Sequence, residues 1–496
     1  MTPTPPRPSA AAIPPRPSGA GVAPRPSAAG VAPRSRAVGP ADAEVIRADA
    51  FAVALPVGRW STDPAVVDAH RLDRSGWLPD GRPLGVAFAR EVSDVQAVLR
   101  VAVARGVPVT VRGAGTGLAG GAAAGPGGVV LDLAGMNSIR ELSVDDAVAV
   151  VEPGVITADL DAAAREVGLC YAPDPASAAI STIGGNIATN AGGLRCAKYG
   201  VTRESVLGLD VVLADGELIS TGRRTVKGVA GYDLTGLFVG SEGTLGVVVG
   251  ATVRLRPAPR ATVTLAAYFD TVAAAVDAVT ALGAAGIVPA VAELLDARTV
   301  RAVDAATGSD LAAHGEVFLL VQTDGSGAVE EADAAEAVLA GRARLVRRSA
   351  DAATAETLLA ARRAALPALE RLGRVLIEDI AVPRGRLAQA VARVTEIGAD
   401  TGVEIFTLAH AADGNLHPII VVDPSLPEIP PQAWAAAEQI FALALELGGT
   451  VTGEHGVGVL KRRWLATELG SRSHDLQRQL RRVFDPTGIL NPGRAL

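Results

Sequence analysis

The stretch Arg112-Gly-Ala-Gly-Thr-Gly-Leu-Ala-Gly-Gly121 is the most informative about the fold. It holds the spacing G-x-G-x-x-G at Gly115, Gly117 and Gly120, which is typical of dinucleotide-binding loops. In a Rossmann fold a helix begins directly after these glycines. Residues 122–128 read Ala-Ala-Ala-Gly-Pro-Gly-Gly and leave no room for a helix, so the Rossmann fold is excluded. Two interpretations remain: a backbone cradle for a pyrophosphate, or a plain glycine-rich turn.

Two further stretches favour the cradle. Ile183-Gly-Gly-Asn-Ile-Ala-Thr-Asn-Ala-Gly-Gly193 follows Pro173-Asp-Pro-Ala-Ser177 and precedes Lys198-Tyr-Gly200, and Gly240-Ser-Glu-Gly-Thr-Leu-Gly246 comes about 40 residues later. Three loops dense in Gly, Asn, Ser and Thr within one domain indicate that the backbone approaches a large polar ligand closely.

The periodicity around these loops alternates between helices and strands. We expect a helix over residues 91–106, with Ser93 and Gln96 as its capping box. We also expect a helix over 157–167, strands over 107–112, 129–133, 147–151 and 244–255, and a hairpin over 210–219. Pro257 and Pro259 stop the last strand, so we place a domain boundary at residue 257.

The second half of the chain has a different pattern. Predicted helices over 272–282, 330–340, 354–372, 386–401 and 431–447 mix with predicted strands over 317–323, 403–409 and 416–422. This irregular order predicts an α+β domain with an antiparallel sheet. The Pro/Gly-rich segment 484–496 is expected to dock onto another surface.

Composition excludes several classes of protein. The net charge of the 496 residues is −7, which argues against a nucleic-acid surface. Two cysteines are too few for a disulfide framework, and no apolar run reaches the ~18 residues of a membrane-spanning helix. The motif Pro-Arg-Pro-Ser recurs every nine residues from Pro6, in a tract that cannot bury a core, so residues 1–40 are expected to be disordered. A reducing cytoplasm is the simplest location, with attachment to the inner face of the membrane left open.

Half of the histidines gather in two motifs, His410-Ala-Ala-Asp-Gly-Asn-Leu-His417 and Gly453-Glu454-His455-Gly456. The first places two imidazoles on either side of a turn, and the second adds a carboxylate. Two imidazoles and a carboxylate can form an open site for a divalent metal such as zinc or manganese. The alternative is a pair of hydrogen-bonded histidines at a strand end; the nearby Glu454 favours the metal.

The order of these motifs carries a resemblance to a known family. RGAGTGLAGG, PDPAS, IGGNIATNAGG, KYG and GSEGTLG resemble the FAD-binding domain of the vanillyl-alcohol oxidase and p-cresol methylhydroxylase (PCMH) family. HAADGNLH, GEHGVGVLK and FDPTGILNPG resemble the branch that contains the FAD-binding subunit of glycolate oxidase and the FAD-binding D-lactate and D-2-hydroxyglutarate dehydrogenases. The resemblance covers about residues 70–496. It implies an α+β chain with a two-subdomain FAD-binding domain over 41–257, a cap domain over 258–483 and a C-terminal segment over 484–496 that returns to the flavin.

The resemblance also assigns residues. FAD is expected to be non-covalent, because Thr116 stands where some relatives attach the flavin through a histidine. His455 is implied as the base, Arg362 as the clamp for the substrate carboxylate (Arg363 could exchange roles with it), and Lys461 as a helper. The implied metal ligands are His410, His417 and Glu454. The implied cofactor residues are Arg112, Gly113, Ala114, Gly115, Thr116, Gly117, Pro173, Asp174, Ser177, Gly184, Asn190, Gly193, Glu242, Gly246, Val248 and Asn491.

The implied reaction is FAD-dependent oxidation of a short D-2-hydroxy acid, D-lactate or glycolate, to the 2-keto acid, with hydride transfer to flavin N5. The acid is expected to be short because Leu366, Glu378 and Ile419 stand where the D-2-hydroxyglutarate enzymes have Thr, Lys and Asn. The alternatives are a transferase like alkyl-dihydroxyacetonephosphate synthase and an FAD-binding subunit of a multi-subunit glycolate oxidase. The expected electron acceptor is a quinone, a cytochrome, an electron-transfer flavoprotein or an iron–sulfur subunit. The oligomeric state is left open, with a homodimer as one option.

Overall fold

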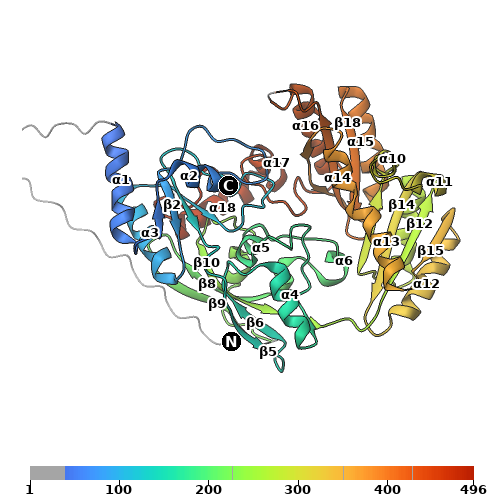
Figure 1. The fold of residues 1–496 in the computed structure, drawn as a ribbon, viewed down its shortest axis with the longest axis horizontal. Coiled ribbons are helices and arrows are strands. Elements are labelled where there is room, and N and C mark those ends of the chain that lie inside the picture. The colour runs from blue at the N-terminus through green and yellow to red at the C-terminus, as the bar shows by residue number, and fades with distance from the viewer. Residues whose placement is uncertain (1–39, 226, 350, 427) are drawn as a thin grey trace, which may run out of the picture. The chain divides into compact units, whose positions relative to one another are not determined.

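The computed structural model describes residues 40–225, 227–349, 351–426 and 428–496 (Figure 1). The predicted disordered tail, residues 1–40, lies outside the described residues except for Pro40, the first residue of helix α1. Residues 44–496 form one compact unit, which is described below. No helix in the described ranges is both long enough and apolar enough to cross a membrane.

The first half of the unit, blue to green in Figure 1, contains two main sheets. The first has the order β1-β2-β4-β3, in which β2, β4 and β3 run parallel. The second is antiparallel, with the order β5-β6-β10-β8-β9. The elements are α1 (Pro40–Ala54), β1 (Trp60–Ser61), α2 (Pro64–His70), β2 (Gly85–Phe88), α3 (Val92–Arg105), β3 (Val109–Arg112), β4 (Val129–Asp132), β5 (Ile139–Ser143), β6 (Val148–Val151), α4 (Thr157–Glu166), β7 (Leu169–Cys170), α5 (Ile183–Thr189), α6 (Cys196–Tyr199), α7 (Thr202–Ser205), β8 (Val206–Val212), β9 (Leu218–Gly222), α8 (Leu234–Phe238), β10 (Val247–Arg254) and β11 (Arg256–Pro257).

Helix α3 lies where the sequence predicts a helix, but its cap differs. Glu91 is the N-cap residue, its side chain accepts from the N3 backbone, and the Asp94 side chain accepts in return from the Glu91 backbone. The predicted box of Ser93 and Gln96 is therefore wrong by two residues. The reason is that Gln96 is occupied elsewhere: its Nε2 donates to the Gly216 carbonyl at 2.8 Å.

The glycine-rich stretches take two different conformations. No helix lies between β3 and β4, as the exclusion of a Rossmann fold requires. The second stretch is not a loop as predicted, since residues 183–189 form helix α5. Thr182 caps its first turn by accepting from the Gly185 N–H, and Asn190 ends it in the left-handed conformation, with φ of +53°. Helix propensities underestimate the tendency of this segment to be helical, because Gly is among the least favourable residues in a helix.

The second half, yellow to orange in Figure 1, is built on one antiparallel sheet with the order β15-β12-β14-β13-β18-β19-β16 and β17 beside β19. Its elements are β12 (Thr262–Phe269), α9 (Val272–Ala284), β13 (Val291–Leu295), α10 (Ala297–Thr307), α11 (Leu311–His314), β14 (Val317–Asp324), α12 (Ala328–Ala340), β15 (Leu345–Arg348), α13 (Ala352–Arg363), α14 (Ala365–Glu370), β16 (Arg374–Ile377), β17 (Ile380–Ala381), the 3₁₀ turn η1 (Arg384–Arg386), α15 (Leu387–Thr401), β18 (Glu404–His410), β19 (Asn415–Val422) and α16 (Pro431–Glu446). Two more helices follow, α17 (Arg462–Leu469) and α18 (Ser471–Phe484), and α18, red in Figure 1, packs on the first half through Phe484 and Phe238.

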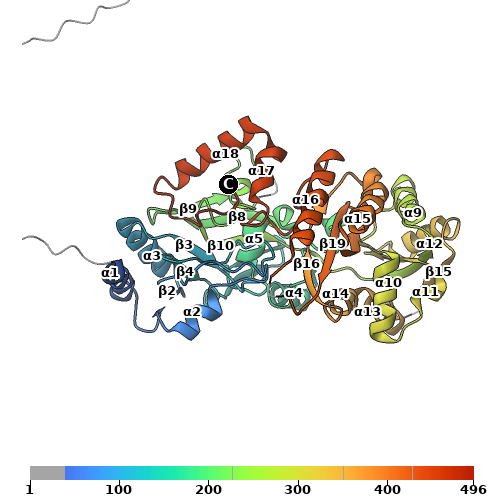
Figure 2. The ribbon, with the colours of Figure 1, turned by 90° about the horizontal axis from the view of Figure 1, so that it is seen from above.

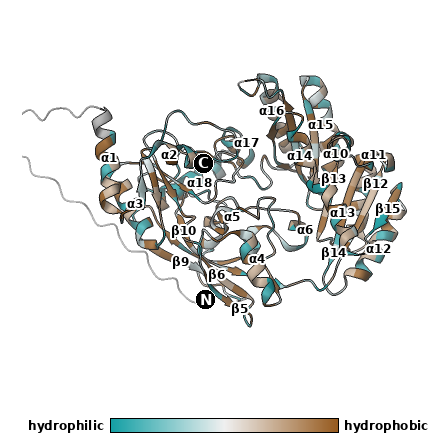
Figure 3. Ribbon diagram, in the orientation of Figure 1, coloured by the Kyte–Doolittle hydropathy of each residue, from teal (hydrophilic) through white to brown (hydrophobic). Residues whose placement is uncertain are grey.

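Both faces of this sheet are covered. Leu319 and Val321 of β14 belong to the core under α9, α12, α15 and α16, whereas the alternate residues Phe318 and Leu320 belong to the core under α10 and α14. Because successive side chains of a strand point to opposite faces, a strand covered on both faces is apolar throughout. The brown strands in Figure 3 show this pattern.

The C-terminal segment returns to the first half. The Val109 N–H of β3 donates to the Ile489 carbonyl at 2.8 Å, and the Asn491 N–H donates to the Val109 carbonyl at 2.8 Å. Ile489 and Leu490 are buried in the same core as α3 and β4. The last residues of the chain therefore extend the sheet that positions the first glycine loop.

Candidate active site

A cavity of about 740 Å³ lies between the two halves of the unit, within the roughly 300–1,000 Å³ typical of ligand pockets. Its lining includes the first glycine loop together with Glu454, His455 and Lys461. The remaining lining residues that matter below are Ser177, Gly184, Glu242, Gly246 and Val248 from the first half, and Leu366, Glu370 and Glu378 from the second.

The first loop has the properties of an anion cradle. The backbone N–H groups of residues 114–117 donate no hydrogen bond within the described part of the chain. Gly115 has φ of +68°, and a Cβ there would overlap the Arg112 guanidinium. Unpaired amides on a loop with no side chains in the way suit a pyrophosphate. The plain-turn interpretation leaves these donors unexplained, so the loop fits FAD.

The implied cofactor residues fall into two groups. Gly113, Ala114, Gly115, Thr116, Gly117, Ser177, Gly184, Glu242, Gly246 and Val248 line the cavity. Arg112, Pro173, Asp174, Asn190, Gly193 and Asn491 do not, and four of them hold neighbouring backbone in place. Arg112 donates to the Leu72 carbonyl, Asp174 pairs with Arg195 at 3.3 Å, Asn190 accepts from the Arg203 N–H at 2.9 Å, and Asn491 donates to the carbonyls of Gly121 and Glu242 at 2.9 and 2.8 Å.

Backbone strain gathers at these positions. Asn190, Glu242 and Asn491 have φ of +53°, +52° and +41°, in the left-handed region that residues other than glycine seldom adopt. Such conformations cost roughly 1–3 kcal/mol each and cluster at ligand sites. Their coincidence with three implied cofactor residues supports that assignment by an observation independent of sequence motifs.

Glu242, in the first half, binds the loop that carries His455. Its Oε1 and Oε2 accept from the N–H groups of Val457 and Gly458, both at 2.8 Å. Burial raises the pKa of Glu242, and these two N–H groups oppose the rise. The loop that carries His455 is thereby fixed to the flavin-binding half.

The predicted metal ligands converge. The Nε2 atoms of His410, at the end of β18, and His417, in β19, lie 3.3 Å apart. Glu454 Oε1 lies 3.5 Å from the first and 3.2 Å from the second. The three residues share one potential metal position, and all are largely buried. Two imidazole nitrogens and a carboxylate oxygen facing one point suit a divalent cation with open positions for a substrate.

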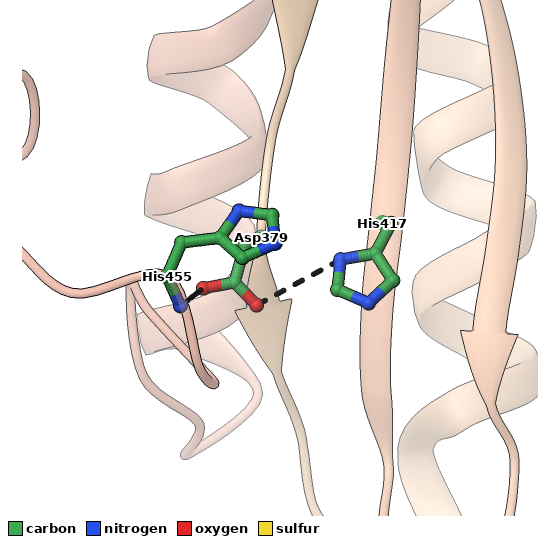
Figure 4. Close-up of side chains that lie close together, drawn as sticks. All are labelled: Asp379, His417 and His455. Carbon is green, nitrogen blue, oxygen red and sulfur yellow. Dashed lines mark hydrogen bonds and ion pairs between the residues drawn. The ribbon is translucent and has the colours of Figure 1, made fainter. Parts of the chain in front are cut away.

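A second potential metal position involves Asp379, His417 and His455 (Figure 4). The carboxylate of Asp379 is already saturated. It accepts from Asn415 Nδ2, Thr452 Oγ1 and the N–H groups of residues 454 and 455, at 2.8 to 3.0 Å, and pairs with Lys461 at 3.3 Å. A carboxylate with this many donors has no lone pair to spare, so the set of His410, His417 and Glu454 fits a metal better.

Two acidic residues that the motifs do not include support this set. Glu293 of β13 is fully buried and contacts His410 Nδ1 through Oε1, the arrangement that orients metal-binding imidazoles. Asp379 holds the 452–455 loop. A sequence signal existed for both: Glu293 is the one charge in the apolar run 290–295, and Asp379 lies between the apolar runs 375–377 and 380–382.

Arg362 is not at the cavity surface, where a residue that clamps the substrate carboxylate is expected. Its Nε donates to Glu293 Oε2 at 2.7 Å, and the residue is not part of the cavity lining. Arg363 instead pairs with Glu356 on the exposed face of α13. Arg362 thus stands behind His410, with its Nη groups unused within the described residues.

His455 is placed to accept a proton. Its ring stacks on that of His417, with centroids 5.1 Å apart and planes 12° apart. Its Nδ1 is buried and has no hydrogen-bond partner among the described residues. Burial lowers the pKa of His455 to about 4, so the imidazole is neutral at pH 7. A neutral imidazole beside an open cavity can act as a base.

Comparison with known proteins gives the family of this chain. Residues 83–222 match the family profile "FAD binding domain", and residues 258–495 match "FAD linked oxidases, C-terminal domain". Glycolate oxidase subunit GlcD of Bacillus subtilis is 43% identical over 83% of this chain and 88% of its own. A D-lactate dehydrogenase of Archaeoglobus fulgidus is 36% identical over 86% and 96%.

Solved structures share the fold. p-Cresol methylhydroxylase superposes with a TM-score of 0.75 and 18% identity, covering 92% of this chain and 97% of its own. Alkyldihydroxyacetonephosphate synthase superposes with a TM-score of 0.69 and 17% identity, over 90% and 85%. The predicted PCMH-type α+β fold is confirmed. The chain belongs to the family of FAD-linked oxidases and is an FAD-linked oxidoreductase.

Proposed function

We propose that this protein oxidises a short D-2-hydroxy acid, D-lactate or glycolate, to the 2-keto acid, with non-covalent FAD and a divalent metal, zinc or manganese. The observation that carries the proposal is that His410 and His417 converge on Glu454, and that Glu454 and His455 line the same cavity as the glycine cradle. The family relatives named as a glycolate oxidase subunit and as a D-lactate dehydrogenase support the substrate class.

When bound, FAD accepts a hydride from the substrate and the cation lowers the charge that develops on the hydroxyl oxygen. The residues of the chain supply the rest. His455, neutral in its buried position, takes the hydroxyl proton. Glu293 fixes the ring of His410, while Asp379 holds the backbone of Glu454 and His455. The base and the ligands are thus oriented before substrate arrives.

Arg362 does not line the cavity, but with its position behind His410 it is still proposed to anchor the substrate carboxylate. Its Nε is engaged by Glu293, and its Nη groups are available for a second, bidentate contact. Lys461 lines the cavity, but its Nζ donates to the Asp379 carbonyl at 2.7 Å. Lys461 is therefore proposed to act mainly by stabilising the Asp379 carboxylate, and not by binding the substrate.

The cavity wall supports a monocarboxylate. Leu366 and Glu378 line it, and neither offers a partner for a second substrate carboxylate. Ile419 is buried outside the lining and does not contribute. A substrate with two carboxylates would face the acid of Glu378, so short acids with one carboxylate are favoured.

The test is anaerobic mixing of the FAD-loaded protein with D-lactate, L-lactate, glycolate and D-2-hydroxyglutarate, following the visible flavin band and the keto acid. We expect bleaching with D-lactate or glycolate, release of the keto acid, and loss of both after chelation. Bleaching by D-2-hydroxyglutarate alone would contradict the short-acid assignment. No bleaching and no keto acid with FAD and metal bound would point to the transferase, or to a subunit that needs its partners.

Electrons must then leave the flavin. A quinone, a cytochrome, an electron-transfer flavoprotein or an iron–sulfur subunit is the proposed acceptor, in the cytoplasm or at the inner face of the membrane. The word "subunit" in the name of the Bacillus subtilis relative supports a larger assembly, and a homodimer is an alternative.

A further inference from the structure

Helix α18 is attached to the protein along one side only. Arg481 donates to the carbonyls of Leu490 and Leu496, at 2.8 and 3.0 Å, and Phe484 packs edge-on against Phe238 with centroids 5.3 Å apart. No residue of the helix is fully buried. In Figure 2 the helix runs along the edge of the flavin-binding half, with no other element outside it.

The outer side of α18 carries an apolar stripe. Leu476, Leu480 and Val483 are 44%, 40% and 73% exposed, and their spacing of i, i+4 and i+7 places them in one row. None of the three belongs to a hydrophobic core of the described residues. A row of this kind on the outside of a helix indicates a contact outside the chain.

Cations occupy much of the rest of the helix surface: Arg472 lies one turn before Leu476, Arg482 lies beside Val483, and Arg478 lies on the opposite side. Arg472, Arg478 and Arg482 are all exposed, and Asp475 is the one acidic residue in the helix. With Arg481, the helix has four arginines against a single acid, whereas the whole chain has a net charge of −7. An exposed helix with an apolar row on one side and arginines on its polar surface has the pattern of helices that lie in the interface of anionic membranes.

We propose that α18 binds the surface of an anionic lipid bilayer, with Leu476, Leu480 and Val483 inserted among the acyl chains and the exposed arginines on the headgroups. This inference does not depend on the proposed substrate. A flavoprotein held in this way would stand beside acceptors that reside in the membrane.

Other occupants fit less well. A second copy of α18 would bring its arginines against those of the first. Residues 1–39 contain five arginines and no acid, so charge repels them too. A stable protein interface buries roughly 800 Å² on each partner, which three partly exposed side chains do not offer.

The experiment is co-sedimentation of the FAD-loaded protein with vesicles of phosphatidylcholine alone and of phosphatidylcholine mixed with phosphatidylglycerol. Two triple variants are compared with the unmodified chain: Leu476→Gln/Leu480→Gln/Val483→Gln and Arg472→Gln/Arg478→Gln/Arg482→Gln. The matched control is Val329→Gln/Leu372→Gln, two residues 48% and 51% exposed in the cap domain. Flavin content and the unfolding temperature confirm that each variant is folded.

We expect binding to the anionic vesicles, reduced at least tenfold by either triple variant and unchanged in the control. High salt should weaken the binding, because the arginine contribution is screened. Equal binding to neutral vesicles, or no binding to anionic ones, would overturn the proposal. Light scattering could instead show a particle larger than one chain. If the apolar triple variant lost this particle and the unmodified protein bound no vesicles, the stripe would be assigned to contact with a second copy.

Discussion

His455 is the residue on which the proposed chemistry depends most directly. Its buried Nδ1 has no partner among the described residues, and its pKa is lowered to about 4. We expect His455→Gln to lower the rate of anaerobic flavin reduction by about 10²–10⁴-fold, the usual contribution of a general base, with FAD content unchanged. His474→Gln on α18 is the matched control. A rate for His455→Gln within threefold of the unmodified protein would remove this residue from the mechanism.

Glu378 supplies a prediction about stability and pH. Burial raises the pKa of Glu378 from 4.5 to about 7. The folded state therefore binds this proton more tightly than the unfolded state, so the stability it contributes is complete below about pH 4.5 and is lost as the pH rises through 7. We expect Glu378→Gln to raise the free energy of unfolding at pH 8 by on the order of 3 kcal/mol and to leave it unchanged near pH 4.5.

Urea unfolding at the two pH values measures the effect of Glu378→Gln, and Glu370→Gln, which lines the same cavity, is the control. Equal stabilisation at both pH values would mean that packing, not ionisation, is responsible.

The residue scale also shows what sequence motifs can and cannot predict. His410, His417 and Glu454 are found from residue type and spacing, because metal ligands must be His, Cys or carboxylates. Glu293 lies 117 residues before His410 and reaches it only because β13 and β18 are neighbours in the sheet. Strand order is a property of the tertiary structure, so the local sequence marks Glu293 as a buried charge but does not identify His410 as its partner.

Among the single elements, the N-terminus of α3 allows a test between two capping boxes: the one in the structure, Glu91 with Asp94, and the predicted one, Ser93 with Gln96. Asp94 accepts from the N–H groups of Arg90 and Glu91, at 2.9 and 3.2 Å, and pairs with Arg59. We expect Asp94→Ala to cost about 1–3 kcal/mol, and Ser93→Ala to cost less than about 0.5 kcal/mol, because the Ser93 side chain makes no cap contact. Chemical denaturation measures the free energy of unfolding of both variants. Equal losses of stability in the two would support the predicted capping box of Ser93 and Gln96.

Elements with many buried apolar residues were the easiest to predict. The strands of the second half follow from runs such as residues 317–321, and α9, α15 and α16 from their periodicity. The predicted helix over 354–372 is divided at Ala364 into α13 and α14, and α17 and α18 were not predicted at all. Helix α18 has the periodic apolar residues Leu476, Leu480 and Val483, but they are few among polar residues and none is buried.

At the scale of the whole molecule, the cavity depends on two halves keeping their alignment. Its lining comes from the glycine loops on one side and from residues 366–378 on the other. Asp324, at the end of β14, joins them: it accepts from Lys198 Nζ at 2.6 Å and from Tyr199 OH at 2.8 Å, both in α6 of the first half. Asp324 is only 6% exposed, so solvent screens these contacts weakly.

We expect Asp324→Ala to weaken the contact between the halves, because it leaves the Lys198 ammonium without its main partner in a partly buried position. Calorimetry should show a lower unfolding temperature and a first transition separated from the second, since contacts between domains within a chain resemble transient interfaces. The apparent KM for the substrate should rise several-fold while FAD is retained, because the cradle and its strand lie within the first half. Asp310→Ala, which changes a carboxylate that is 80% exposed in the cap domain, serves as the control. A single transition at an unchanged temperature, with unchanged KM, would show that the core contacts alone hold the halves in register and that Asp324 adds nothing to them.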